Sequence, residues 1–375
     1  DYELTAWTKR SIRQADMILI VGLANASPQL CEIEYHLMKD ADNAQKNRCL
    51  VLLHDTKVQL PTGTVRWLAN RNVRTHYHMR LGETADYQRI GRLITGHGVG
   101  LVLSGGGART LAHIGVIQAL QECGLPIDAI GAVSGGAIVA GLWAMGLSVT
   151  EMVQQCRQVT DRVDYTLPLH ALTRGRNWTN AMKNLFGEVL IEDLWQQFFC
   201  ISTNLSQANL QMHESGSLMH GVRASTAIPG ILPPVFHAGE ILVDGGLINN
   251  FPTDLMRAHP DIGQVIAVDV GKADSSQKVL PFDYAVSGWK SLLSRLSPWG
   301  TGATAPTISE ILLQSISITN NQSAKVTKHI VDLYLEPPVK TFGLLDFNKI
   351  RQLVDIGYDY AHEELVDWQN QRNIA

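Results

Sequence analysis

The sequence predicts an α/β fold, with a three-layer α/β/α domain around a mainly parallel central sheet and a small α/β unit ahead of it. Three observations predict it. Short apolar runs that suit strands alternate with amphipathic runs that suit helices. Two strand-to-helix junctions in the middle of the chain are tight glycine-rich turns, which are typical of parallel strands joined by helices. Hydrophobic residues make up 45% of the 375 residues and charged residues only 18%, which suits a large buried core.

Residues 1–97 form the predicted small unit. Strands are expected there at 17–22, 49–54 and 73–78, and helices at 29–44 and 85–95. His76 and His78 would share one face of a strand, but no carboxylate or cysteine accompanies them. We therefore interpret them as ordinary strand histidines and expect no metal.

The main domain is predicted over residues 98–340, followed by a helical extension over 341–375. Its first two βα units are strand 101–103 with helix 108–123, and strand 129–133 with helix 135–145. An antiparallel hairpin at 198–204 and 209–213 and strands at 241–244 and 265–270 complete the predicted sheet.

Composition and charge exclude several classes of protein. A net charge of -4 does not favour binding to nucleic acid. No apolar run reaches the roughly 18 residues of a membrane-spanning helix. Five scattered cysteines without a CxxC pair indicate reduced thiols and a cytoplasmic protein. The sequence begins at Asp1, which leaves room for upstream regulatory domains that this chain lacks.

A glycine-rich turn, Ser104-Gly105-Gly106-Gly107, follows the first strand of the main domain. Free N–H groups in such a turn, at the start of a helix, suit an anion, either a nucleotide phosphate or the oxyanion of an attacked ester. A dinucleotide fingerprint needs a third glycine where Thr110 stands. It also needs an acidic residue at the end of the next strand, whereas Asp128 begins that strand. The residues favour the oxyanion.

Ser134 ends the next strand and is followed by Gly135 and Gly136. A serine on a sharp strand-to-helix turn projects at the carboxyl edge of the sheet, as a nucleophile does. The usual G-x-S-x-G pattern has Ala132 in place of its first glycine, and a serine that only caps the helix is the alternative. The glycine turn on the adjacent strand strengthens the interpretation as a nucleophile.

A nucleophilic serine needs a base. Asp244, at the end of a strand and followed by Gly245-Gly246, is a candidate, although Asp-Gly-Gly also occurs in ordinary loops. The histidines beyond it lie at no evident strand end and are expected on the surface: His259, His329 and His362. Asp269 is expected to cap a turn, and His113 to pack beside the glycine turn.

Several segments together resemble the patatin-like phospholipase family, most closely its neuropathy target esterase branch. They are 101–109 (LVLSGGGAR), 111–115 (LAHIG), 134–136 (SGG) and 244–250 (DGGLINN), with 13–16, 191–195, 222–225, 231–234 and 287–289 in support. The resemblance implies a Ser–Asp dyad without a catalytic histidine, in which Ser134 is the nucleophile and Asp244 the general base. It also implies an oxyanion hole from Gly105, Gly106 and Gly107, with Arg109 supporting the glycine loop.

The family's substrates would be lysophospholipids or phospholipids, hydrolysed without a cofactor or metal. Because an aspartate with an ordinary pKa near 3.9 is a weak base, we expect Asp244 to be partly buried, with a raised pKa. Two positions depart from the branch. Ala132-Val133 stands for Gly-Thr before the serine, and Thr110 stands for a glycine. Neither removes a catalytic atom, but both are expected to crowd the backbone near the substrate.

A membrane contact is one interpretation of an amphipathic pattern near residue 290. Apolar residues recur there at helical spacing: Trp289, Leu292, Leu293 and Leu296. The pattern fits an interfacial helix on a peripheral membrane protein, and equally a helix packed on a core. The competing hypothesis for the whole chain is a nucleotide-responsive regulatory protein with a degenerate serine site, suggested by Ala132, Thr110 and the α/β character of residues 1–97.

Overall fold

Two β-sheets organise the computed structural model, which describes residues 4–39, 47–158, 164, 166, 171–271 and 329–374. The strands are β1 (Met17–Leu23), β2 (Asn47–His54), β3 (Thr75–Arg80), β4 (Gly98–Leu103), β5 (Ala129–Val133), β6 (Gln197–Asn204), β7 (Asn209–His213), β8 (Val235–His237), β9 (Glu240–Asp244), β10 (Ile262–Val268) and β11 (Leu333–Leu335). The small sheet has the order β1-β2-β3 and is parallel throughout. The large sheet has the order β11-β10-β4-β5-β6-β9-β8, with β7 also paired to β6.

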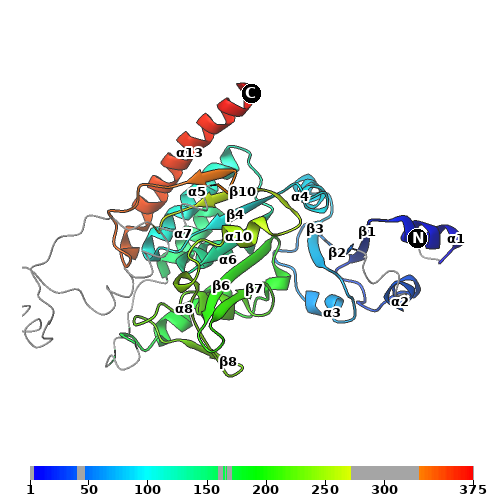
Figure 1. Cartoon of the computed structure of the whole chain (residues 1–375), viewed down its shortest axis with the longest axis horizontal. Coiled ribbons are helices and arrows are strands. Elements are labelled where there is room, and N and C mark those ends of the chain that lie inside the picture. The colour runs from blue at the N-terminus through cyan, green and yellow to red at the C-terminus, as the bar shows by residue number, and fades with distance from the viewer. Residues whose placement is uncertain are drawn as a thin grey trace, which may run out of the picture.

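The helices and short 3-10 turns connect these strands (Figure 1). The helices are α1 (Ala6–Gln14), α2 (Glu32–Lys39), α3 (Thr64–Leu68), α4 (Thr84–Ile94), α5 (Ala112–Glu122), α6 (Gly135–Ala144), α7 (Val149–Gln158), α8 (Arg176–Phe186), α9 (Leu218–Ser225), α10 (Thr253–Arg257) and α13 (Ile350–Ile374). The 3-10 turns are η2 (Gly107–Leu111), η3 (Ile191–Asp193), η4 (Gly245–Leu247) and η5 (Phe347–Lys349).

The large sheet is parallel from β11 to β6 and antiparallel where β7, β9 and β8 join it. Every residue of β4 and β5 is buried, as expected for parallel strands covered on both faces. The predicted mainly parallel α/β fold is therefore confirmed. Since β4 and β5 are neighbours, the turns that follow them lie at the same edge of the sheet.

Side chains alternate between two hydrophobic cores on the two faces of the large sheet. Leu101 and Leu103 of β4 pack with apolar residues of α5, α6, α7, α8, α9 and α13. Val102 of the same strand packs on the other face, with residues of α4, α10, β2 and β3. The sheet is thus the middle of three layers.

The small unit shares the second of these cores. Val51 of β2 and Tyr77 of β3 lie in one apolar cluster with Val133 and Ile201 of the large sheet. In Figure 1 β3 and α4 lie against the large sheet, whereas α1 and α2 lie farthest from it. Residues 1–97 are therefore packed onto the large sheet rather than tethered to it.

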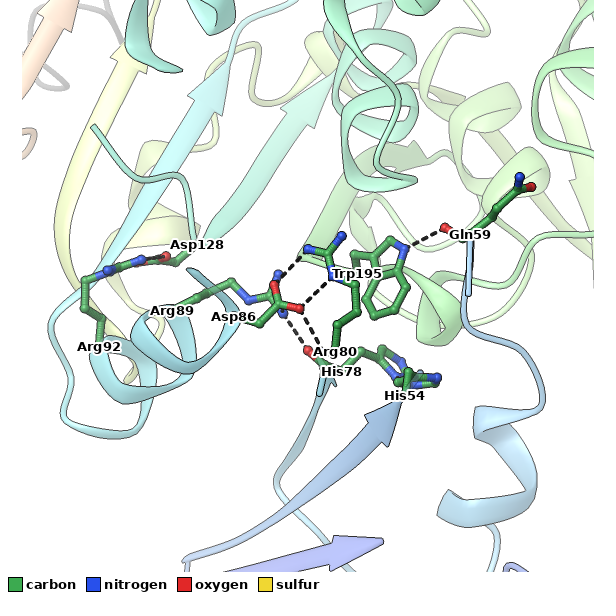
Figure 2. Close-up of polar contacts among 9 residues, drawn as sticks. All are labelled: His54, Gln59, His78, Arg80, Asp86, Arg89, Arg92, Asp128 and Trp195. Carbon is green, nitrogen blue, oxygen red and sulfur yellow. Dashed lines mark hydrogen bonds and ion pairs between the residues drawn. The ribbon is translucent and has the colours of Figure 1, made fainter. Parts of the chain in front are cut away.

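Polar contacts surround that shared core (Figure 2). The Arg80 guanidinium donates to Asp86 and lies 4.8 Å from the ring centroid of Trp195. Trp195 in turn donates from Nε1 to the carbonyl of Gln59 at 2.8 Å. Arg92 of α4 donates to both carboxylate oxygens of Asp128, just ahead of β5. These bonds join the small unit to the strands that carry the candidate site.

The two predicted strand histidines belong to this interface. His76 Nε2 and His78 Nε2 lie 2.9 and 2.8 Å from the carbonyl oxygen of Glu192, to which both donate. In neutral His78 the other ring nitrogen, Nδ1, must then accept, and His54 Nε2 lies 2.9 Å from it. The cluster is thus a docking contact for the segment 191–195.

The C-terminal helix α13 crosses α5 at very close range. A Cβ on Gly115 would overlap the carbonyl oxygen of Val354, and one on Gly357 would overlap that of Ala112. Glycines at both points allow the two backbones to touch. The predicted extension 341–375 is thus a helix from residue 350 onward that covers the main domain.

Most predicted elements match the structure within a few residues. The third strand lies two residues later than predicted, at Thr75–Arg80. The predicted helix 108–123 is divided into η2 and α5, which meet between Leu111 and Ala112. The helix predicted at 29–44 is described as Glu32–Lys39, and 40–46 lie outside the described residues.

Candidate functional site

Ser134 sits on the sharp turn between β5 and α6. Its φ of +55° and ψ of -134° lie in a region that side-chain-bearing residues rarely adopt. The Ser134 N–H donates to Ser225 Oγ at 2.9 Å, which helps to hold this conformation. A Cβ on Gly136 would lie 2.6 Å from the carbonyl oxygen of Ser104, so the following residues must be small. The strained turn predicted from the sequence is present.

Asp244, the last residue of β9, meets this serine. Ser134 Oγ donates to Asp244 Oδ2 at 2.6 Å, and the Gly246 N–H donates to Oδ1 at 2.8 Å. Antiparallel pairing of β9 with β6 brings Asp244 opposite Ser202, next to β5. Residues 110 positions apart in the sequence are thereby joined.

The Asp244 carboxyl is 4% exposed, and burial raises its pKa from 3.8 to about 6, although the bonds from Ser134 and Gly246 lower it. No lysine, arginine or histidine of the described residues pairs with it. A carboxylate with this pKa is still mostly ionised at neutral pH but is a stronger base than an ordinary aspartate. It can accept the proton of the Ser134 hydroxyl.

The glycine loop runs from the end of β4 into η2, directly beside the serine. A Cβ on Gly105 would lie 2.9 Å from Ser134 Cβ. The Gly105 N–H donates to the carbonyl of Asn250 at 3.3 Å. Neither the Gly106 nor the Gly107 amide donates to another group in the part of the chain that the structure describes. The Gly106 and Gly107 amides of this loop are therefore unbonded among the described residues.

Three side chains donate hydrogen bonds to the carbonyl groups of this loop. His113 Nε2 donates to Ser104 O at 3.0 Å, and Thr110 Oγ1 donates to Gly107 O at 2.6 Å. Asn250 Nδ2 donates to Gly105 O at 3.2 Å. The loop is thus fixed by three side chains, two of which follow it closely in sequence.

Arg109 supports the loop from the side of the C-terminal region. Its guanidinium donates to the carbonyls of Phe342 at 2.7 Å and Lys340 at 3.1 Å. The Ala108 N–H donates to Leu344 O at 2.8 Å, which binds the same segment to the loop. The Arg109 guanidinium thus ties the glycine loop to the segment 340–344, a position that fits loop support.

The two departures from the family pattern do not act alike. Ala132 is fully buried in the core with residues of α5 and α6, and crowding near the substrate at this position stays a prediction. Thr110 uses its hydroxyl to hold the glycine loop. Threonine there adds a bond that a glycine could not make.

The other candidate side chains play different parts. Asp269 Oδ1 accepts from the Gly271 N–H at 2.9 Å, as expected for a residue that caps a turn. Burial lowers the pKa of His113 to about 4, which keeps its ring neutral beside the glycine loop. Among the described residues no histidine hydrogen-bonds to Ser134 or Asp244.

The described ranges hold neither a cluster of metal-binding side chains nor a membrane-spanning helix. No group of three or more histidine, cysteine or acidic side chains there is arranged to hold a metal ion. None of the helices found there is both long and apolar enough to cross a bilayer. The suggested membrane-facing residues lie outside the described residues: Trp289, Leu292, Leu293 and Leu296.

Two site residues had no predicted role, namely Ser225 and Asn250. Both lie within the segments that resemble the family, 222–225 and 244–250. Membership of those segments is the signal in the sequence that marks both residues as site candidates. The local pattern does not show which backbone group each side chain contacts.

A parallel α/β sheet that presents a serine on a strained turn, an aspartate at hydrogen-bonding distance and a glycine loop has the architecture of a serine hydrolase site. Residues 101–257 match the family model described as patatin-like phospholipase. Residues 1–97 match the model described as the Neuropathy Target Esterase family P-loop like domain. The chain belongs to the patatin-like phospholipase family, in its neuropathy target esterase branch.

Individual relatives agree with this assignment. The chain is 34% identical to human patatin-like phospholipase domain-containing protein 6, over 98% of this chain and 29% of that protein. It is 32% identical to lysophospholipase nte1 of Neosartorya fischeri, over 96% of this chain and 27% of that protein. It thus spans under a third of these relatives. The solved structure of VipD from Legionella pneumophila is 16% identical, with a TM-score of 0.41, and covers 72% of this chain and 67% of its own.

Proposed function

We propose that this chain is a serine carboxylic-ester hydrolase that acts on lysophospholipids or phospholipids, with Ser134 as nucleophile and Asp244 as general base. The observation that carries the proposal is the 2.6 Å bond from Ser134 Oγ to a buried carboxylate whose pKa is raised to about 6. The substrate class is supported by relatives named as a phospholipase and a lysophospholipase.

In the first step Asp244 takes the hydroxyl proton as Ser134 Oγ attacks the ester carbonyl carbon. The carbonyl oxygen becomes an oxyanion, for which the free Gly106 and Gly107 amides are the proposed donors. Gly105 holds the loop beside the serine instead, since its own N–H is bonded to Asn250 O. Collapse of the intermediate expels the alcohol, which takes the proton from Asp244, and leaves an acyl group on Ser134.

In the second step a water molecule releases the acyl group. Asp244, again ionised, takes a proton from this water as its oxygen attacks the acyl carbon. The same two amides hold the second oxyanion. The fatty acid leaves and the proton returns to Ser134, so one aspartate serves both steps without a histidine.

The nucleotide-responsive alternative has weaker support. Asp128, the acidic residue nearest to a dinucleotide pattern, is buried and bound by Arg92 and by the Val99 N–H. It is not free to bind a ribose. The one observation that favours a regulatory role is the match of residues 1–97 to a P-loop like domain.

The test is labelling by a fluorophosphonate probe together with turnover of lysophosphatidylcholine, diacyl phosphatidylcholine and a p-nitrophenyl ester. Ser134→Ala should abolish labelling, and both Ser134→Ala and Asp244→Asn should lower kcat by at least about 10³-fold. Asp269→Asn is the matched control, because it changes another buried aspartate at a strand end. If Asp244→Asn keeps kcat within tenfold of wild type, the dyad is wrong.

We also propose that the protein is cytoplasmic and contacts membranes peripherally through the apolar residues at 289–296, the segment with interfacial periodicity. Co-sedimentation with phosphatidylcholine vesicles tests the contact. A folded double variant Trp289→Ser, Leu293→Ser should lose vesicle binding but still cleave a soluble p-nitrophenyl ester. Binding equal to that of wild type would exclude this segment.

A further inference from the structure

The Asn250 side chain lies where the glycine loop meets the turn after Asp244. Asn250 is buried and bonds to Gly105 twice: its side-chain Nδ2 donates to the Gly105 carbonyl, and its backbone carbonyl accepts from the Gly105 N–H. A Cβ on Gly246 would lie 2.7 Å from Asn250 Oδ1, and one on Gly271 would lie 2.7 Å from Nδ2. A Cβ on Gly105 would also overlap Asn250 Oδ1, so glycines on three segments make room for this one amide.

The direction of the Gly105 carbonyl decides the direction of the next N–H. In a planar trans peptide the C=O of one residue and the N–H of the following residue point to opposite sides. Because Asn250 Nδ2 holds Gly105 O, the Gly106 N–H points away from Asn250. That N–H is one of the two amides of the glycine loop that donate to no group among the described residues.

We propose that Asn250 is a positioning residue for the oxyanion hole, which aims the Gly106 N–H at the oxyanion formed during attack by Ser134. The inference rests on the proposed function. Asn250 makes no hydrogen bond to Ser134 Oγ or to the Asp244 carboxylate, whose bonds come from Ser134 and Gly246. It therefore acts through the loop and is not itself catalytic.

The two other side chains that donate to carbonyls of the loop, those of His113 and Thr110, orient different N–H groups. His113 holds Ser104 O, and the next N–H, that of Gly105, donates to Asn250 O. Thr110 holds Gly107 O, and the next N–H, that of Ala108, donates to Leu344 O. Of these three side chains, only Asn250 donates to the carbonyl of a peptide group whose N–H has no partner among the described residues.

The experiment compares Asn250→Ala and Asn250→Asp with Asn249→Ala in hydrolysis of p-nitrophenyl butyrate at pH 8. Asn249 is the matched control, since its amide donates to Asp254 on the other side of the turn. Loss of one oxyanion donor costs about 10²–10³ in kcat, so a misaimed donor should lower kcat by about 10- to 100-fold. KM should stay within about threefold, and Asn249→Ala should resemble wild type.

The pH profile distinguishes a role of Asn250 in orienting the Gly106 N–H from a role in setting the pKa of Asp244. In Asn250→Ala the acid limb of kcat/KM should keep its wild-type midpoint, because the hydrogen bonds of Asp244 are untouched. A midpoint moved by more than half a pH unit would overturn the inference in favour of a role on Asp244. So would a kcat within about threefold of wild type in a folded variant.

Folding and the proposed function are controlled separately. If Asn250→Ala does not fold, Asn250→Asp decides, since its ionised carboxylate has nearly the same shape but cannot donate to Gly105 O. Ser134→Ala is run in the same assay. Activity that survives in Ser134→Ala refutes the proposed function, whereas an inactive Ser134→Ala beside a fully active Asn250→Ala refutes this inference alone.

Discussion

Two buried carboxylates in this protein show how neighbouring groups decide what an aspartate can do. Asp86 at the interface is 2% exposed and Asp244 in the candidate site is 4% exposed. Burial raises the pKa of both, but at Asp86 the bond and charges of Arg80 and Arg89 outweigh it and lower the pKa. Asp244 has only a hydroxyl and an amide, and its pKa stays raised at about 6. Asp86, which is paired with arginines, therefore stays ionised near neutral pH, whereas Asp244 can take up and release a proton there.

The same contrast appears in the backbone and side chains around them. Ser134 adopts a strained φ of +55°, and its amide is tied to Ser225. Arg89, which faces Asp86, is itself buried and donates to the carbonyl of His78. At the interface Asp86 pairs with Arg80 and Arg89, which favours stability, whereas the glycine loop keeps two amides that are unbonded among the described residues, which favours chemistry.

Removal of the paired carboxylate should give the largest effect on stability. Asp86→Ala leaves buried Arg89 without its ion-pair partner, so the free energy of unfolding should fall by about 3–5 kcal/mol. Chemical denaturation measures it. Lys340→Ala, which removes an exposed pair with Glu336, is the control and should cost under about 1 kcal/mol. Equal losses in the two variants would mean that the interface pair is no more important than a surface pair.

Removal of the unpaired carboxylate should have the opposite sign. The folded-state pKa of Asp244 lies above the unfolded value, so its favourable contribution is complete below pH about 3.8 and is lost as pH rises through about 6. At pH 8 the buried anion therefore destabilises the fold. Asp244→Asn should raise the free energy of unfolding by about 1–3 kcal/mol at pH 8, and by less at pH 5. A destabilised Asp244→Asn at pH 8 would contradict this account.

The pH dependence of activity sharpens the comparison further. Asp244 must be ionised to act as a base, so kcat/KM should be constant above pH 7 and fall about tenfold per pH unit below about 6. The Asp86 carboxyl, whose pKa is lowered, should add no second limb in this range. Initial rates on a p-nitrophenyl ester between pH 5 and 8 measure the profile. A profile that stays flat down to pH 5 would show that burial does not raise the pKa of the base.

The smallest expected effect concerns the strained serine. Ser134→Gly relieves the cost of a positive φ, which Ser134→Ala retains, so the glycine variant should be more stable than the alanine variant by about 1 kcal/mol. Both variants should be inactive, so their difference in stability reports strain and not catalysis. Paired thermal unfolding of the two variants gives the difference. A glycine variant that is less stable than the alanine variant would argue against stored strain at this turn.

Local sequence patterns predicted the strands and turns that carry the site. Glycines after β4 and β5 and the small residues around Ser134 indicate tight strand-to-helix turns, and both are present. The family resemblance, more than spacing, singled out Asp244, because Asp-Gly-Gly alone fits an ordinary loop. No local pattern could show that Asn250 holds Gly105, since the bond spans 145 positions and depends on how β9 and β4 are placed.

By itself, the sequence determined the local conformations, because apolar periodicity and glycine placement act over a few residues. It thereby determined the class of fold and the two turns at one edge of the sheet. Only the tertiary structure decided which groups meet there. Pairing of β9 with β6 brought the aspartate to the serine, and packing of residues 1–97 and α13 buried the surrounding sheet. Burial and the absence of a cation among the described neighbours, rather than residue type, make Asp244 basic while Asp86 stays an anion.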